Sequence, residues 1–104
     1  MPDRPFTAHR LPEELAEVRR LLDALATSLA ARAAARPRDL LAAAWPAPLA
    51  TVGEWEGVWE ALRNVGGLGP AALTPDERAA HAEALRLVER ALRRQMNDDR
   101  AQHP

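Results

Sequence analysis

The feature that most constrains the fold is a line of leucine and valine residues in the first third of the chain. Its members recur at alternating steps of four and three residues, the spacing that places them on one side of an α-helix. They are Leu11, Leu15, Val18, Leu22, Leu25 and Leu29. Such a seam is typical of a helix that packs along its length against another helix, so it predicts a helix–helix interface.

The composition favours a core built from helices alone. The chain has 104 residues, of which 47% are hydrophobic, and that is enough for one compact domain. Leucine, valine, alanine and three tryptophans supply most apolar side chains, whereas isoleucine, tyrosine and cysteine are absent. Because sheets prefer β-branched and aromatic residues, we expect an all-α protein. The absence of cysteine excludes a disulfide framework, a thiol nucleophile and a cysteine zinc site.

Proline residues mark the first two predicted helices. Pro12 and the acidic residues after it favour a long helix over about 12–36, because proline and negative charge suit a helix N-terminus. Pro37 disfavours helical geometry in the residue before it and should end that helix. A shorter helix is expected over about 38–45, stopped by Pro46.

Two capping boxes mark the starts of the other helices. In this motif a Ser or Thr caps the helix, and a Glu or Gln three residues later returns a hydrogen bond to the cap. The pairs and the helices that they begin are Thr51 with Glu54 for about 52–64, and Thr74 with Glu77 for about 75–97. We therefore predict a small antiparallel bundle of two long helices and two shorter ones.

The rest of the chain is expected to lie outside this bundle. We predict a flexible N-terminal arm over residues 1–10, a single helical domain over 11–97 and a disordered C-terminal tail over 98–104. Neither a secretory leader nor an apolar run long enough for a membrane span is visible. The sequence thus favours a soluble, cytoplasmic protein with no membrane partner.

The third predicted helix carries the candidate partner-binding residues. Opposite its two tryptophans, small residues recur at four-residue steps at Gly53, Gly57 and Ala61. Glycine inside a helix costs about 1 kcal/mol relative to alanine, and a small-residue stripe lets another backbone come close. The alternative is that Gly53 lies in the first turn and Gly57 is merely tolerated.

Charge and one further tryptophan complete the predicted partner site. Glutamates flank the small residues and favour a basic partner, and Trp45 either covers the core or anchors a partner. The predicted partner-binding residues are Gly53, Glu54, Gly57, Glu60, Ala61 and Trp45.

A second candidate surface lies on the last predicted helix. Four arginines within one arc could follow nucleic-acid phosphates, although nearby glutamates also predict an ordinary solvated face. These arginines are Arg86, Arg90, Arg93 and Arg94. The formal net charge is −1, so the molecule as a whole has no electrostatic attraction to nucleic acid.

No residue pattern indicates catalysis. Ser28 lacks a base in a recognisable motif, and carboxylate pairs occur only at positions expected to be exposed. His81 and Glu77 have the spacing of a shared metal ligand pair, but a site needs three or four ligands. We instead expect a buried His81 bonded to a carboxylate or a backbone carbonyl. The sequence predicts no enzyme, no catalytic residue, no metal and no cofactor.

By elimination, the sequence predicts a non-catalytic helical interaction protein: an adaptor, a regulatory subunit or a helix-binding chaperone. Its partner would be another protein, for example through an amphipathic helix. The regular seam, widened by Leu21, also predicts a homodimer. The alternative is a small nucleic-acid-associated protein that uses the arginine face. All 14 basic residues are arginine, which we attribute to codon usage in a GC-rich bacterial genome.

Overall fold

Four α-helices and one short 3-10 turn make up the part of the chain that the structure describes. The structure is a computed structural model, and it describes residues 11–102. The elements are α1 (Leu11–Ala31), α2 (Ala35–Ala42), α3 (Val52–Gly66), the 3-10 turn η1 (Pro70–Ala72) and α4 (Pro75–Gln102). These residues contain no β-strand, and the predicted all-α bundle of two long and two shorter helices is confirmed.

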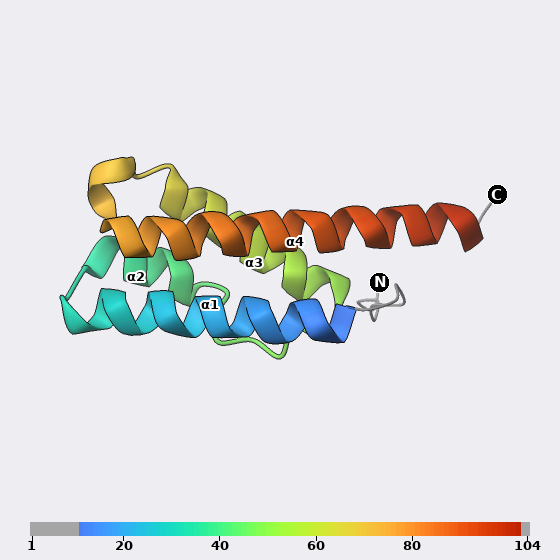
Figure 1. Cartoon of the computed structure of the whole chain (residues 1–104), viewed down its shortest axis with the longest axis horizontal. Helices are drawn as coiled ribbons and strands as arrows, with labels where there is room; N and C mark the ends of the chain where they lie inside the picture. Colours follow the sequence, from blue (N-terminus) through green and yellow to red (C-terminus); the bar gives the residue numbers. More distant parts are fainter. Residues whose placement is uncertain (1–10, 103–104) are drawn as a thin grey trace.

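The two long helices, α1 and α4, lie antiparallel and side by side (Figure 1). An ion pair joins them near each end of α1. At one end Arg94 lies 2.7 Å from Glu14, and at the other Arg32 lies 2.6 Å from Glu77. The shorter helices α2 and α3 pack against this pair and against each other.

Four of the six residues of the predicted seam lie in the interior of this bundle, and Leu15 is half-buried against it. Val18, Leu22, Leu25 and Leu29 are at most 1% exposed, within a core that includes the fully buried Trp55. The helix–helix interface that the seam predicts therefore lies within one chain. A homodimer would need a different surface, because these side chains already have partners in their own subunit.

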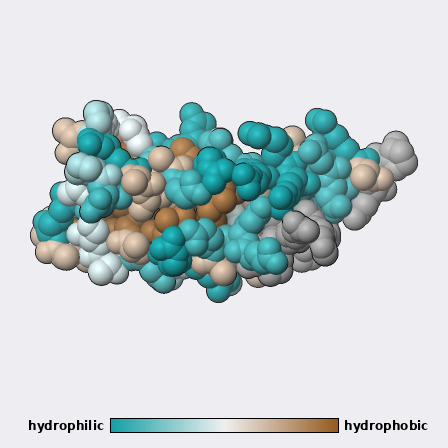
Figure 2. Space-filling model, in the orientation of Figure 1, coloured by the Kyte–Doolittle hydropathy of each residue, from teal (hydrophilic) through white to brown (hydrophobic). Residues whose placement is uncertain are grey.

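On one face of the bundle, apolar side chains reach the surface between polar ones. Figure 2 shows apolar side chains reaching the surface mainly in the furrow between α1 and α4, in the half away from the chain ends. Hydrophilic residues border this furrow on both sides. The visible apolar residues are thus narrow openings onto the core and do not form a broad exposed patch on this face.

The first helix ends at Ala31, five residues before the predicted end. The chain leaves it through a Schellman motif, in which the N–H of Ala34 bonds the carbonyl of Leu29 and that of Ala33 bonds Ala30. Ala33 has a φ of 53°, in the left-handed region that glycine usually occupies at this position. The second helix was predicted over about 38–45, but α2 begins at Ala35 and ends at Ala42. Pro37 lies in its first turn, where the missing N–H breaks no helical bond, so it does not separate the two helices as expected.

The last helix corrects the prediction at the other end of the domain. We expected residues 98–104 to form a disordered tail, but α4 continues to Gln102. Within this extension Gln95 donates a 3.1 Å hydrogen bond to Asp99 one turn later, which supports the final turns. The predicted N-terminal arm, residues 1–10, and the last two residues lie outside the described part of the chain.

Both predicted capping boxes form. The backbone N–H of Glu54 donates to the Thr51 hydroxyl at 3.3 Å, and that of Glu77 donates to the Thr74 hydroxyl at 3.2 Å. The Glu77 carboxylate returns a bond by accepting from the Thr74 N–H at 2.9 Å. These caps set the starts of α3 and α4, the two helices that border the groove described next.

Candidate binding groove between α3 and α4

The predicted stripe of small residues on α3 faces the chain's own α2 segment. Ala61 is only 4% exposed. A Cβ atom added to Gly57 would lie 4.0 Å from the Cβ of Ala44, just after α2. The close approach that the stripe permits is therefore largely used within the molecule, because α2 packs on this side of α3.

The remaining predicted residues do not gather into one deep site. Gly53 and Glu60 are exposed on α3, whereas Glu54 serves the cap and also accepts from the Ala50 N–H at 3.3 Å. Glu54 and Gly57 border a shallow hollow of about 320 Å³, whose other walls are alanines and prolines of residues 42–48. This hollow lacks aromatic or large aliphatic anchors.

Trp45 lies against the core and is half-buried. Its indole Nε1 donates a 3.2 Å hydrogen bond to Asp23 of α1. The ring thus covers the core and ties the segment after α2 to α1, which is the first of the two roles that the sequence left open.

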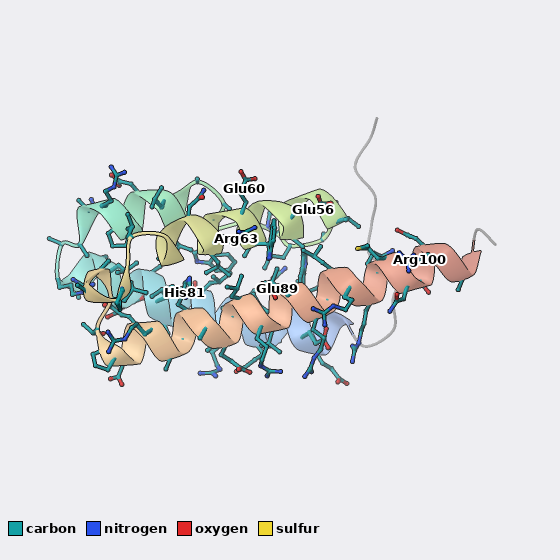
Figure 3. All side chains as sticks on the ribbon, turned by 90° about the horizontal axis from the view of Figure 1, so that it is seen from above. Glu56, Glu60, Arg63, His81, Glu89 and Arg100 are labelled. Carbon is teal, nitrogen blue, oxygen red and sulfur yellow. The ribbon has the colours of Figure 1, made fainter. Side chains whose placement is uncertain are left out.

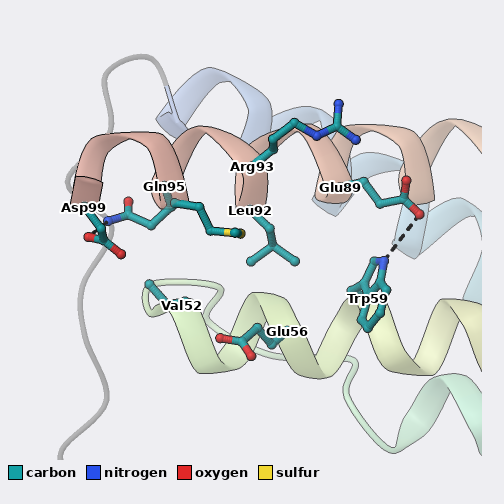
Figure 4. A pocket seen from close by; sticks show the side chains of 9 residues that line it. Val52, Glu56, Trp59, Glu89, Leu92, Arg93, Gln95 and Asp99 are labelled. Carbon is teal, nitrogen blue, oxygen red and sulfur yellow. Dashed lines mark hydrogen bonds between the residues drawn. The ribbon is translucent and has the colours of Figure 1, made fainter. Parts of the chain in front are cut away.

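A larger groove lies on the other side of α3, between this helix and the C-terminal half of α4 (Figure 4). It has a volume of about 470 Å³. Its lining residues come from both helices: Val52, Glu56, Trp59, Glu89, Leu92, Arg93, Gln95, Met96 and Asp99. The volume is in the range of sites that hold a small ligand or a few side chains of a partner.

The floor of the groove is apolar, and one of its residues is unusually exposed. Trp59 and Leu92 are half-buried, while Met96 is 56% exposed, the one large hydrophobic side chain in the described residues that is exposed to this degree. Methionine is flexible and polarisable, and it suits surfaces that accept apolar side chains of different shape. Within residues 11–102, the groove therefore offers an apolar contact area that remains partly exposed.

The indole of Trp59 closes one end of the groove. Its Nε1 donates a 3.3 Å hydrogen bond to Glu89 across the helices (Figure 4). The guanidinium of Arg63 lies 4.9 Å from the ring centre. These contacts hold the ring at the boundary of α3 and α4. Because the indole is fixed before any partner arrives, little side-chain freedom would be lost on binding.

Carboxylates dominate the charge around the groove. Glu56, Glu89 and Asp99 contribute three acidic groups, and Arg93 is the single basic lining residue. Glu89 points from α4 toward α3 (Figure 3), whereas the side chain of Arg93 points away from α3 (Figure 4). Three of the four charged residues that line the groove are therefore acidic.

The four arginines of the predicted arginine face differ in their contacts, because two of them form ion pairs with glutamates. Arg94 pairs with Glu14 of α1, and Arg86 pairs with Glu83 at 2.5 Å. The hydrogen bond from Arg86 lowers the pKa of Glu83 below its ordinary value. Arg90 is exposed, and Arg93 borders the acidic groove. These four arginines thus present fewer unpaired positive charges than their spacing suggests.

A buried polar cluster at the other end of the bundle was not predicted. Glu77 is 2% exposed and accepts hydrogen bonds from Arg32, with its Nη2 at 2.6 Å, and from the Ser28 hydroxyl of α1. Arg32 also donates to the carbonyl of Ala72 at 2.7 Å. The bonds from Arg32, Ser28 and the Thr74 N–H lower the pKa of Glu77 to about 2, although burial opposes them.

His81 takes the backbone alternative that the sequence allowed. Its Nε2 lies 2.6 Å from the carbonyl oxygen of Leu62 in α3, and it serves as the donor there. The Glu77 carboxylate accepts hydrogen bonds from Ser28 and Arg32, so Glu77 and His81 do not form a metal-ligand pair. Within residues 11–102 no three His, Cys, Asp or Glu side chains gather where they could hold a metal ion.

The groove could be found only in part from the sequence. The apolar line of the last predicted helix includes Leu92 and Met96, but the same pattern is typical of buried positions. The useful signal is that Met96 is the last apolar residue before the run of Asn97, Asp98 and Asp99. The apolar face of a helix that continues to a polar helix end can extend beyond the neighbouring helix that packs against it.

Comparison with known proteins adds no assignment, because the chain matches no family model, no curated protein and no solved structure. Among the helices of residues 11–102, none combines the length and the apolar character needed to cross a membrane.

Proposed function

We propose that this chain is a non-catalytic interaction protein that binds a segment of another protein in the groove between α3 and α4. The observation that carries the proposal is the apolar floor of Trp59, Leu92 and Met96, with Met96 56% exposed at its open side. A groove between two fixed helices is a common site for an amphipathic helix, which buries its apolar face there. An adaptor, a regulatory subunit or a helix-binding chaperone would all act in this way.

The proposal is tested by changing the most exposed apolar residue. Met96→Asp should leave the fold intact, because the side chain is on the surface, and should weaken partner retention by placing a charge on the groove floor. The measurement is co-purification from the native host with mass identification of bound proteins. Arg90→Asp is the matched control, since Arg90 is exposed on the same helix but does not line the groove.

The outcomes are distinct. Loss of the same identified protein with Met96→Asp, and its retention with Arg90→Asp, would support the groove. Equal retention by both variants would reject it. Loss with Arg90→Asp alone, together with DNA binding that weakens steeply as salt rises, would favour the arginine face of α4 and a nucleic-acid-associated role.

Self-association is a separate proposal. The seam of α1 is buried, so a homodimer would form through another surface such as this groove. Light scattering after size-exclusion chromatography measures the mass directly. A mass near 11.4 kDa at about 100 μM would reject the dimer, because an interface of ordinary affinity is occupied at that concentration.

A further inference from the structure

We infer that the groove between α3 and α4 selects a basic amphipathic helix, with an apolar stripe flanked by lysine or arginine. This inference rests on the proposed function and specifies the chemistry of the partner. It starts from the shape of the site, in which an apolar floor runs between two helices and charged side chains stand along its edges.

The length of the groove sets the length of the partner segment. Glu89 and Asp99 mark its extent on α4, and ten helical residues rise by about 15 Å. A docked helix of about three turns would span that distance and offer apolar anchors at i, i+3 or i+4, and i+7. The lining has four apolar side chains, of which Trp59, Leu92 and Met96 are the more exposed and would receive them, while Val52 is buried.

The edges of the groove decide the charge of the partner. A helix on the floor would meet Glu56 on the α3 side and Glu89 on the α4 side, both among the lining residues. Arg93 is the single basic lining residue, and its side chain points away from α3 (Figure 4), so acidic groups outnumber basic ones along the groove. Basic residues beside the apolar stripe would be attracted to both edges, while acidic ones would be repelled.

The same electrostatics argue against other occupants. Phosphate backbones and anionic lipid surfaces carry negative charge and would be repelled by these carboxylates. A purely apolar segment would leave Glu56 and Glu89 without new partners while removing part of their hydration, which is unfavourable. A basic amphipathic helix satisfies the floor and the edges together.

The test compares two synthetic peptides with the full-length protein. Both have about 14 residues and the same leucine stripe, and they differ only in carrying lysine or glutamate beside it. Calorimetry measures affinity. The ε-methyl NMR signal of Met96 reports the location, since the chain has only two methionines. We expect the lysine peptide to shift this signal and to bind at least tenfold more tightly than the glutamate peptide, with an affinity that falls as salt rises.

Variants on α3 give the matched comparison. Glu56→Arg should weaken the lysine peptide at least tenfold, whereas Glu60→Arg, one turn further along the same helix and pointing into solvent (Figure 3), should change it less than threefold. The inference is overturned if the two peptides bind equally, if Met96 does not shift, or if both variants have the same effect.

Other occupants give different results, and each would overturn the inference. If the lysine peptide binds only after residues 1–10 are removed, this chain's own N-terminal segment occupies the groove. If the protein is a dimer that Met96→Asp dissociates, a second copy occupies it. If Met96→Asp loses an identified native partner while the lysine peptide fails to bind, the proposed function stands and the charge assignment is wrong.

Discussion

The indole Nε1 of Trp55 donates a 2.9 Å hydrogen bond to the backbone carbonyl of Leu49, and both residues are 0% exposed. Leu49 has a φ of 55°, a left-handed conformation that is uncommon for leucine. The bond satisfies a carbonyl that has turned into the core. A single tryptophan of α3 thus fills the centre of the bundle and holds the segment that leads into its own helix.

Trp55→Phe should therefore destabilise the protein more than its loss of volume alone suggests. It leaves the buried Leu49 carbonyl without this donor, which costs about 1–3 kcal/mol. Trp45→Phe is the control, because that indole bonds Asp23 from a half-buried position, and we expect it to cost under about 1 kcal/mol. Urea unfolding measures both, and equal losses would contradict the role given to the Leu49 bond.

Ala33→Gly should stabilise the protein. Ala33 has a φ of 53° at the end of α1, and a left-handed residue with a side chain costs roughly 1–2 kcal/mol. Glycine removes this strain but has more freedom in the unfolded chain, so we expect a net gain of about 0.5–1 kcal/mol. Ala16→Gly, at an exposed position inside α1, should instead lose about 1 kcal/mol. A thermal melt that shows loss for both would reject the strain.

Glu77→Gln should reduce both stability and its dependence on acid. The pKa of Glu77 falls from 4.5 to about 2 in the folded protein. Because the folded value is the lower one, the carboxylate stabilises the fold above about pH 4.5, and this contribution is lost as the pH falls toward 2. We expect a loss of about 1–3 kcal/mol near neutral pH.

Urea unfolding at several pH values between 6 and 2 checks this prediction. The wild type should lose more stability across the window than Glu77→Gln does. Glu83→Gln serves as the comparison, because its ion pair with Arg86 is exposed and contributes little to stability. An unchanged acid response in Glu77→Gln would show that other carboxylates govern it.

Two glycines of α3 should respond differently to alanine. A Cβ at Gly57 would meet Ala44 at 4.0 Å, an ordinary contact, whereas one at Gly66 would lie 3.2 Å from Cε1 of His81. Gly57→Ala should gain up to about 1 kcal/mol from helix propensity. Gly66→Ala should gain less or lose stability, since the imidazole bonded to Leu62 must shift. The reverse order of melting temperatures would contradict this reading.

The sequence predicted the starts of α3 and α4 well because capping chemistry is local, whereas α2, which has no side-chain cap, begins three residues before its predicted start. Thr51 and Thr74 each bond a glutamate three residues away, and the structure forms both motifs. The end of α1 was missed for the same reason, since its terminating position holds Ala33 in place of glycine and carries no local signal. Pro37, which looked like a stop, is compatible with the first turn of the next helix.

The groove could be predicted only in part because it depends on two helices at once. Trp55 and Leu62 of α3 and Val88 of α4 lie in the core, on the apolar faces of these helices. The spacing of apolar residues within one helix cannot show that Trp59 and Met96, on the same apolar faces, lie where α3 and α4 leave space between them. The position of this space depends on how α3 and α4 are aligned along each other, and the apolar spacing within one helix does not determine that alignment.

The Glu77 carboxylate takes part both in a helix cap and in a contact between two distant helices. It closes the capping box of α4 with Thr74, and it accepts bonds from Arg32 and Ser28, which precede it by 45 and 49 residues. The first turn of α4 and the last turns of α1 therefore share one side chain and should open together as a cooperative unit. In native-state hydrogen exchange their amides would then report a common opening free energy, although the bonded residues are 45 and 49 positions apart in the sequence.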